Sequence, residues 1–92
     1  MSTVTISVTA GHIAAGEREK CERCPVALAF LAALPRVDKA VVTGFGASLY
    51  RDGVKTRLRL PDAASDFVGA FDNAEPVSPF EFAIDIPEGL AA

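Results

Sequence analysis

Apolar and polar residues alternate in three stretches of the chain, at 3–8, 54–60 and 80–86. Successive side chains of a strand point to opposite faces, so this alternation predicts strands with one buried and one exposed face. In 54–60 the exposed face carries one lysine and two arginines. Strands of this kind are typical of antiparallel or mixed sheets, in which one face stays open.

A further apolar stretch, 40–50, precedes the second of these strands. We expect it to form one strand, in which Gly44 and Gly46 mark a bulge or a close approach of another backbone. Asp52-Gly53 then joins it to 54–60, because this dipeptide adopts the conformations that a tight hairpin turn needs.

The segment from Val26 to Leu34 is apolar on every side. Pro25 fits the first position of a helix, which places Cys24 at the N-cap, and Pro35 ends the helix. A helix without a polar face must be covered all round. The helix is therefore either deeply buried within the domain or covered in part by a partner subunit, which would make the protein a homodimer.

Two further helices are expected. Thr9 is suited to cap a short helical turn that runs through Ile13 and ends at Gly16. Apolar residues also recur with helical spacing between Ala64 and Phe71, and Asp62 is a plausible cap for this helix.

The predicted elements follow in the order β-α-β-β-α-β, with the extra helical turn after the first strand. We expect one α+β domain over residues 1–92, built on a four-stranded, mostly antiparallel sheet with two helices on one face. A ferredoxin-like sandwich has this order of elements. The order of the strands within the sheet stays open.

Acidic and basic residues lie in different parts of the chain, although the net charge is only −3. All nine Lys and Arg occur in residues 1–60, whereas residues 61–92 contain seven acidic residues and no basic one. Opposed surface potentials of this kind can steer a charged partner. The acidic residues expected to face a partner protein are Asp62, Asp66, Asp72, Glu75, Glu81 and Asp85.

Basic residues near the second hairpin strand suggest an alternative partner, a nucleic acid. Lys and Arg bind phosphates. Base stacking needs aromatic side chains as well, and none alternates with these residues on their face of the strand. A nucleic acid is therefore the less favoured partner. The residues that would contact it are Arg51, Lys55, Arg57 and Arg59.

Cys21 and Cys24 are separated by two residues, as in many metal and thiol sites. Together with His12 they offer three ligands for zinc, but a structural zinc ion needs a fourth, from a glutamate or a second chain. A redox pair is another interpretation, since a thiol at a helix N-terminus ionises more easily. In a third interpretation Cys24 only caps the helix. The spacing alone does not separate these three.

Catalytic and membrane signals are weak. His12 is the only histidine, no Ser-His-Asp set can be named, and Gly44-Phe45-Gly46 lacks the later Gly and Lys of a phosphate-binding loop. No apolar run approaches the roughly 18 residues of a membrane span, and the first residues do not resemble a secretory signal. We expect a cytoplasmic, non-enzymatic protein without a cofactor or a membrane contact.

Residues 5–31 (TISVTAGHIAAGEREKCERCPVALAFL) resemble small uncharacterised proteins of actinobacteria and their phages, in which an I-x-x-G turn precedes a CPVALA-type helix. The segment 67–82, with its Phe, Pro and acidic positions, is similar as well. The resemblance implies a phage or mobile-element accessory protein that inhibits a host defence protein, such as a CRISPR component. It implies no catalytic residues. The leading expectation is therefore a protein-interaction module, with an anti-CRISPR protein as one example.

Overall fold

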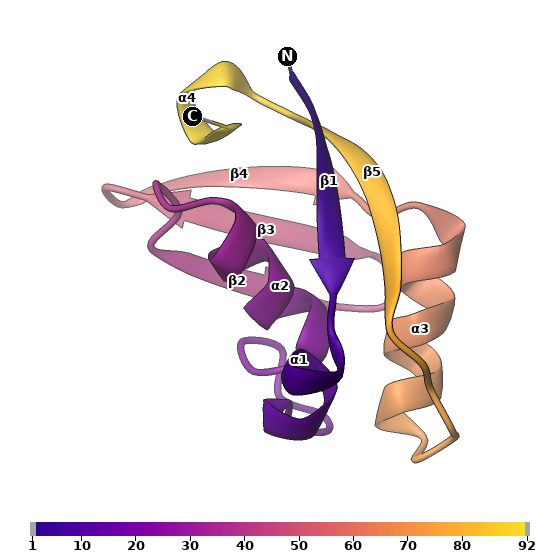
Figure 1. Cartoon of the computed structure of the whole chain (residues 1–92). Coiled ribbons are helices and arrows are strands. Elements are labelled where there is room, and N and C mark those ends of the chain that lie inside the picture. Colours follow the sequence, from indigo (N-terminus) through magenta and orange to yellow (C-terminus); the bar gives the residue numbers. More distant parts are fainter. Residues whose placement is uncertain (1, 92) are drawn as a thin grey trace.

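Two small antiparallel sheets and four helices make up residues 2–91, which are the residues that the computed structural model describes (Figure 1). The chain is therefore α+β, as predicted. The elements in order are β1 (Ser2–Val8), α1 (Ala10–Ala15), α2 (Pro25–Ala33), β2 (Lys39–Val42), β3 (Gly46–Arg51), β4 (Val54–Arg59), α3 (Asp62–Asp72), β5 (Phe80–Ile86) and α4 (Glu88–Ala91).

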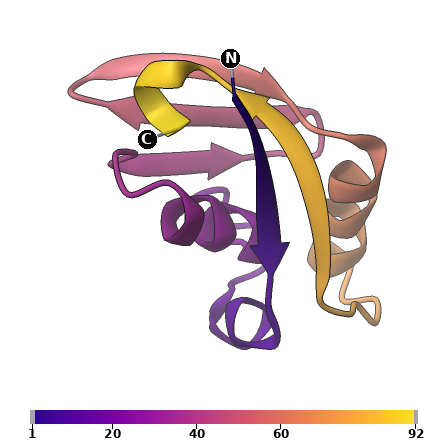
Figure 2. The same ribbon diagram turned by 45° about the horizontal axis from the view of Figure 1, so that its top comes forward.

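The strands pair differently from the expected arrangement. β1 and β5 form one sheet, in which Ser2 pairs with Ile86 and Val8 with Phe80. β2, β3 and β4 form the second sheet as a meander. The strands of the two sheets run across each other in both views (Figures 1 and 2). The single four-stranded sheet, and with it the ferredoxin-like order, is wrong, because the terminal strands pair with each other and not with the meander.

A turn interrupts the stretch 40–50, which was expected to be one strand. The Thr43 hydroxyl accepts a hydrogen bond from the Phe45 N–H at 3.2 Å, and the Thr43 N–H donates to the Gly46 carbonyl at 2.9 Å. The chain therefore reverses between β2 and β3. A Cβ at Gly46 would lie 2.7 Å from the Leu58 carbonyl oxygen, so this glycine does permit a close backbone approach, as predicted.

Helix α2 lies in the core between the two sheets (Figure 2). Its N-terminus is capped as predicted, with Pro25 at the first helical position and the Cys24 sulfur accepting a hydrogen bond from the Ala27 N–H at 3.4 Å. Phe30 is fully buried and meets the ring of Phe82 in β5 edge to face, with ring centres 5.9 Å apart. The helix also packs against β1 and β2. One side of this apolar helix is thus buried within the molecule, whereas Leu28 and Leu31 are only partly buried and Ala32 is exposed. The homodimer expected from this helix therefore stays a prediction.

Helix α3 lies beside β5 (Figure 1). Phe67 and Val68 are buried, in line with the predicted helical spacing, and Phe67 stacks on Phe80 with ring centres 4.8 Å apart. The predicted cap at Asp62 is wrong. Pro61 occupies the N-cap without a side-chain hydrogen bond, and Asp62 is the first residue of the helix. Its carboxylate still favours the helix through the macrodipole.

The remaining helices are short. α1 begins after Thr9 and ends before Gly16, close to the predicted bounds. α4 was not indicated by the sequence pattern, and it places Leu90 in the core. Within residues 2–91, no helix is long and apolar enough to cross a lipid bilayer.

Candidate interaction surface

The three-stranded sheet has one covered and one open face. Alternate residues such as Ala40, Ala47 and Leu49 are buried in the core. Directly paired residues of neighbouring strands point to the same side of a sheet. The register pairs Lys39 with Tyr50, and Tyr50 with Lys55, on the side away from the core. By the same pairing the open face also holds Val41, Gly46, Ser48, Arg57 and Arg59.

Four residues of this face are cationic and none of its strand residues is acidic. We call Lys39, Lys55, Arg57 and Arg59, together with Tyr50, the basic face. Within residues 2–91, Arg57 and Arg59 form no ion pair and no side-chain hydrogen bond. Lys39 lies 3.5 Å from the Glu22 carboxylate, an exposed pair that contributes little to stability. The two arginines are therefore available to an acidic partner.

Tyr50 lies among these cations. The Lys39 ammonium is 5.1 Å and the Lys55 ammonium 6.0 Å from the centre of its ring, which is the range of cation–π attraction. No aromatic residue alternates with the basic residues within β4 itself, as the sequence interpretation had it, but the neighbouring strand β3 brings Tyr50 to the same face. The missed signal is the Asp52-Gly53 turn, because a two-residue turn pairs residue 50 with residue 55.

Phe45 extends the basic face at the turn between β2 and β3. Its side chain is 95% exposed, which is unusual for a large apolar residue. It lines an open hollow of about 480 Å³ together with Lys55, Arg57 and Arg59. Exposed aromatic side chains beside arginines are typical of protein–protein contact surfaces.

Arg51 does not belong to this face. Its guanidinium donates to the carbonyl of Gly89 in α4 and lies 3.7 Å from the Asp52 carboxylate. The residue alternates with Tyr50 along β3 and therefore points to the other side of the sheet. Of the four residues predicted to contact a nucleic acid, only Lys55, Arg57 and Arg59 therefore lie on one face.

The acidic residues expected to face a partner are spread over α3, the segment after it and β5. Three of them accept hydrogen bonds within the molecule. Asp72 accepts from the Glu19 N–H at 3.0 Å, Glu81 from the Ser7 hydroxyl at 2.8 Å and Asp85 from the Thr3 hydroxyl at 2.6 Å. These contacts tie Asp72 to the loop before α2, and Glu81 and Asp85 to the neighbouring strand β1. They give the three carboxylates structural roles.

The three remaining carboxylates of this set are exposed. Asp62 and Asp66 lie one turn apart on α3, and Glu75 follows the helix. Asp62 also lines an open groove between β4 and β5, where Asp85 and two arginines lie as well. Both signs of charge therefore meet in this groove.

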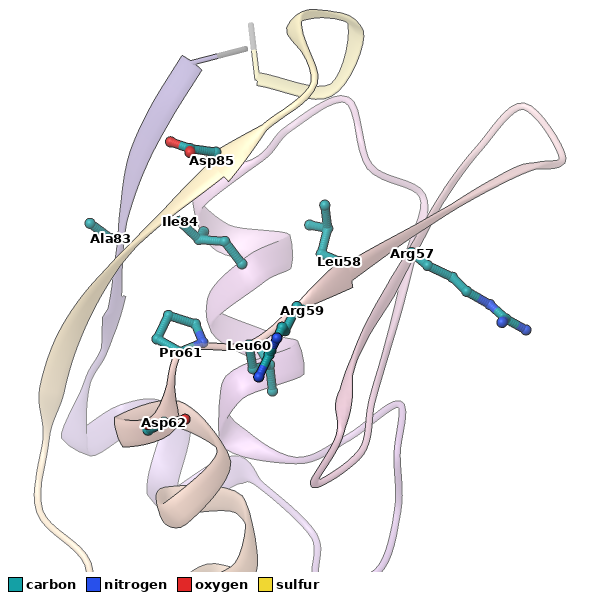
Figure 3. Close-up of a pocket in the computed structure, with 9 residues that line it drawn as sticks. All are labelled: Arg57, Leu58, Arg59, Leu60, Pro61, Asp62, Ala83, Ile84 and Asp85. Carbon is teal, nitrogen blue, oxygen red and sulfur yellow. The ribbon is translucent and has the colours of Figure 1, made fainter.

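The groove between β4 and β5 has a volume of about 660 Å³ (Figure 3). Leu58 and Ile84 project from the two strands into the space between them. Arg57 and Asp85 point away from each other on the outer sides of the strands. The bottom of this groove is therefore apolar and its rims are charged.

The cysteines and the histidine are not gathered into a metal site within residues 2–91. Within the described part of the chain, no group of three or more His, Cys, Asp or Glu side chains is placed to hold a metal ion. The His12 side chain accepts a hydrogen bond from the Thr9 backbone N–H at Nδ1, at 3.1 Å. The backbone N–H of His12 in turn donates to the Thr9 hydroxyl at 3.2 Å. The histidine thus completes a capping box of α1. The structure gives no support to the zinc alternative.

The two thiols are free and lie in different environments. Cys21 is exposed, whereas Cys24 is only 3% exposed. Burial raises the pKa of the Cys24 thiol above its ordinary value, although hydrogen bonds from the Ala27 and Val26 N–H groups act in the opposite direction. A buried protonated thiol is a poor nucleophile. This favours the cap interpretation of Cys24 over the redox interpretation.

Comparisons with protein-family models, with curated proteins and with solved structures give no match to this chain. The resemblance to actinobacterial and phage proteins therefore stays a prediction. Function has to be inferred from the surfaces that the fold presents.

Proposed function

We propose that this protein is a non-enzymatic interaction module that binds an acidic surface of a partner protein through the basic face and Phe45. The observation that carries the proposal is the composition of one open sheet face, where four strand residues are cationic and none is acidic, next to the exposed aromatic ring of Phe45. The resemblance implies a host defence protein as the partner, and an acidic surface on such a protein would fit this chemistry.

A protein partner fits this face better than a nucleic acid does. Nucleic-acid-binding sheets offer aromatic rings on which bases stack. Here the ring of Tyr50 is flanked by the ammonium groups of Lys39 and Lys55, so a base would have to displace them.

Phe45 and the arginines have the chemistry of interface anchors. An aromatic ring that is exposed in the free protein gains most when a partner removes it from water, and arginine forms paired hydrogen bonds with carboxylates. Truncation of such an anchor typically weakens binding by about 2 kcal/mol or more. We therefore expect Phe45→Ser to reduce affinity for the partner by about thirtyfold or more.

Affinity capture from the source organism tests this proposal. The bait is the full chain, and captured proteins are identified by mass spectrometry with and without nuclease treatment. We expect Arg57→Glu/Arg59→Glu to lose the proteins that the parent captures. The matched control, Asp62→Lys/Asp66→Lys, alters two exposed carboxylates of α3 and should retain them. Asp72 is unsuitable for this control because it bonds the Glu19 N–H.

Two outcomes would contradict the proposal. Loss of the captured proteins in the α3 variant but not in the arginine variant would move the contact to the acidic residues. Loss of capture after nuclease treatment would identify a nucleic acid as the partner. Circular dichroism of each variant verifies that the fold is retained.

A further inference from the structure

Strand β4 forms the edge of its sheet within residues 2–91, since it pairs with β3 alone. The Tyr50 and Gly46 carbonyls accept hydrogen bonds on the β2 side, from the N–H groups of Asp38 at 2.8 Å and Thr43 at 2.9 Å. These two residues of β3 therefore do not bond their β4 partners, Lys55 and Arg59. In an antiparallel ladder, bonded and non-bonded pairs alternate. The backbone N–H and C=O groups of residues 55, 57 and 59 consequently point away from the sheet.

The hairpin turn between β3 and β4 indicates independently which residues of β4 bond β3 and which point away from the sheet. Asp52 and Gly53 both have positive φ, 51° and 80°, as in a two-residue type I′ turn. Such a turn makes Arg51 and Val54 a bonded pair, so Val54, Thr56 and Leu58 bond β3 and the residues between them do not. Among the described residues, no backbone hydrogen bond joins positions 55, 57 or 59 to another segment. One side of β4 thus carries a row of unpaired donors and acceptors.

The space beside this edge is open. The 660 Å³ groove between β4 and β5 begins at the edge and is lined on its inner side by Leu58, Leu60 and Ile84 (Figure 3). Leu58 is only half-buried, although Ala47, its direct partner on β3, is buried. A neighbouring strand would lie about 4.8 Å from β4. A strand added here would cover Leu58 and use the unpaired backbone groups.

Charge decides which strand can be added. Charged side chains on an edge strand normally prevent pairing with another edge. A second copy of this chain, pairing antiparallel through β4, would bring Lys55, Arg57 and Arg59 against the same residues of its partner, and like charges opposite each other are destabilising. Carboxylates at those positions would instead be attracted. The side chains between them would face Leu58 and the groove, where apolar residues fit.

From these observations we infer that the β4 edge binds an extended segment of the partner protein, with alternating acidic and apolar residues, by strand addition. This inference rests on the proposed function and adds the mode of binding and the chemistry of the recognised segment. Main-chain hydrogen bonds to residues 55, 57 and 59 supply affinity, and the cationic side chains supply specificity.

Amide hydrogen exchange, measured by nuclear magnetic resonance on the unaltered chain, tests the inference. The probe is a capped synthetic peptide of eight residues in which Glu and Val alternate, and the control is the same peptide with Lys in place of Glu. In the free protein the amides of Val54, Thr56 and Leu58 should exchange slowly, and those of residues 55, 57 and 59 rapidly. At a concentration of the Glu peptide about ten times its Kd, exchange at the latter three should slow roughly tenfold. The Lys peptide should have no effect.

Two N-methylated versions of the Glu peptide separate backbone pairing from simple charge attraction. One carries N-methyl groups on the Glu residues and the other on the Val residues, so both keep the same charge. In an added strand only one of these two sets of N–H groups faces β4. We expect one methylated peptide to lose the protection of residues 55, 57 and 59 and the other to keep it. Equal effects of the two would overturn the inference.

Other outcomes distinguish this inference from the proposed function. If the Glu peptide shifts the signals of Tyr50 and Phe45 but leaves the three edge amides unprotected, strand addition is refuted and the basic face stays a protein-binding surface. If those amides are already protected in the free protein in proportion to its concentration, a second copy occupies the edge and the inference fails. If the peptide has no effect on any of these signals, the inference fails, and the capture experiment alone decides the proposed function.

Discussion

Replacing Cys24 by alanine should destabilise the protein by about 2 kcal/mol. The substitution removes the sulfur that accepts the Ala27 N–H at the start of α2, and loss of an N-cap acceptor typically costs about 1 kcal/mol. The same atom is buried in the core, and removing one buried atom of this size costs about 1 kcal/mol more. For a domain of this length, the sum corresponds to a fall in Tm of roughly 10 °C.

Urea unfolding followed by circular dichroism, in the presence of a reductant, measures this loss. Two matched variants separate its parts. Cys24→Ser keeps an oxygen that can accept the Ala27 N–H, so it should recover about half of the lost free energy of unfolding. Cys21→Ser alters the exposed thiol of the pair and should stay within about 0.5 kcal/mol of the parent.

The reasoning fails if Cys21→Ser and Cys24→Ala destabilise the protein equally. The two thiols would then act as a unit, as in a shared metal site or a redox pair, and the cap interpretation would be wrong. A Cys24→Ala variant as stable as the parent would show that the sulfur contributes nothing to the start of α2. Addition of a chelator should leave all four unfolding curves unchanged.

Three further predictions concern stability. Gly46→Ala should lower the free energy of unfolding by about 1–3 kcal/mol, since its Cβ would press on the Leu58 carbonyl, whereas Gly44→Ala, with nothing within 4 Å, should be neutral in the same urea assay. Phe30→Ala should cost about 3–5 kcal/mol by removing a fully buried ring, measured as a fall in the urea midpoint. The raised pKa of Cys24 means that the folded state retains this proton longer than the unfolded state, so stability should fall as pH rises above about 8.5 and on through the folded pKa. Cys24→Ser should lack this part of the alkaline decline in unfolding scans at successive pH values.

Local signals along the chain predicted most elements correctly. Thr9 and Cys24 begin helices as their residue types indicate, and the alternation in 80–86 is a strand with its apolar side in the core. Asp52-Gly53 forms the expected tight turn. These features depend on neighbours within a few residues, which is why one sequence is sufficient to find them.

Features that depend on distant neighbours were missed. Nothing in one sequence shows that β1 and β5 pair with each other. The turn from Thr43 to Gly46 was hidden because apolar residues lie on both sides of it, so the stretch resembles one long strand. Tyr50 was missed at the candidate surface for a different reason. The two-residue turn at Asp52-Gly53 already determines that Tyr50 pairs with Lys55. The sequence interpretation considered the basic residues along β4 alone and not together with the residues of β3 that pair with them.

The pairing of β1 with β5 also affects the order in which the molecule folds. The meander β2–β4 and helix α2 involve residues close in sequence, and such local contacts form early. β1 is synthesised long before its strand partner, which begins only at Phe80. Until β5 is synthesised, Ile6 and Val8 lie in a strand that lacks its pairing partner. β1 can therefore pair only after β5 has been made, and closing the long loop between these two strands should be the slow step of folding.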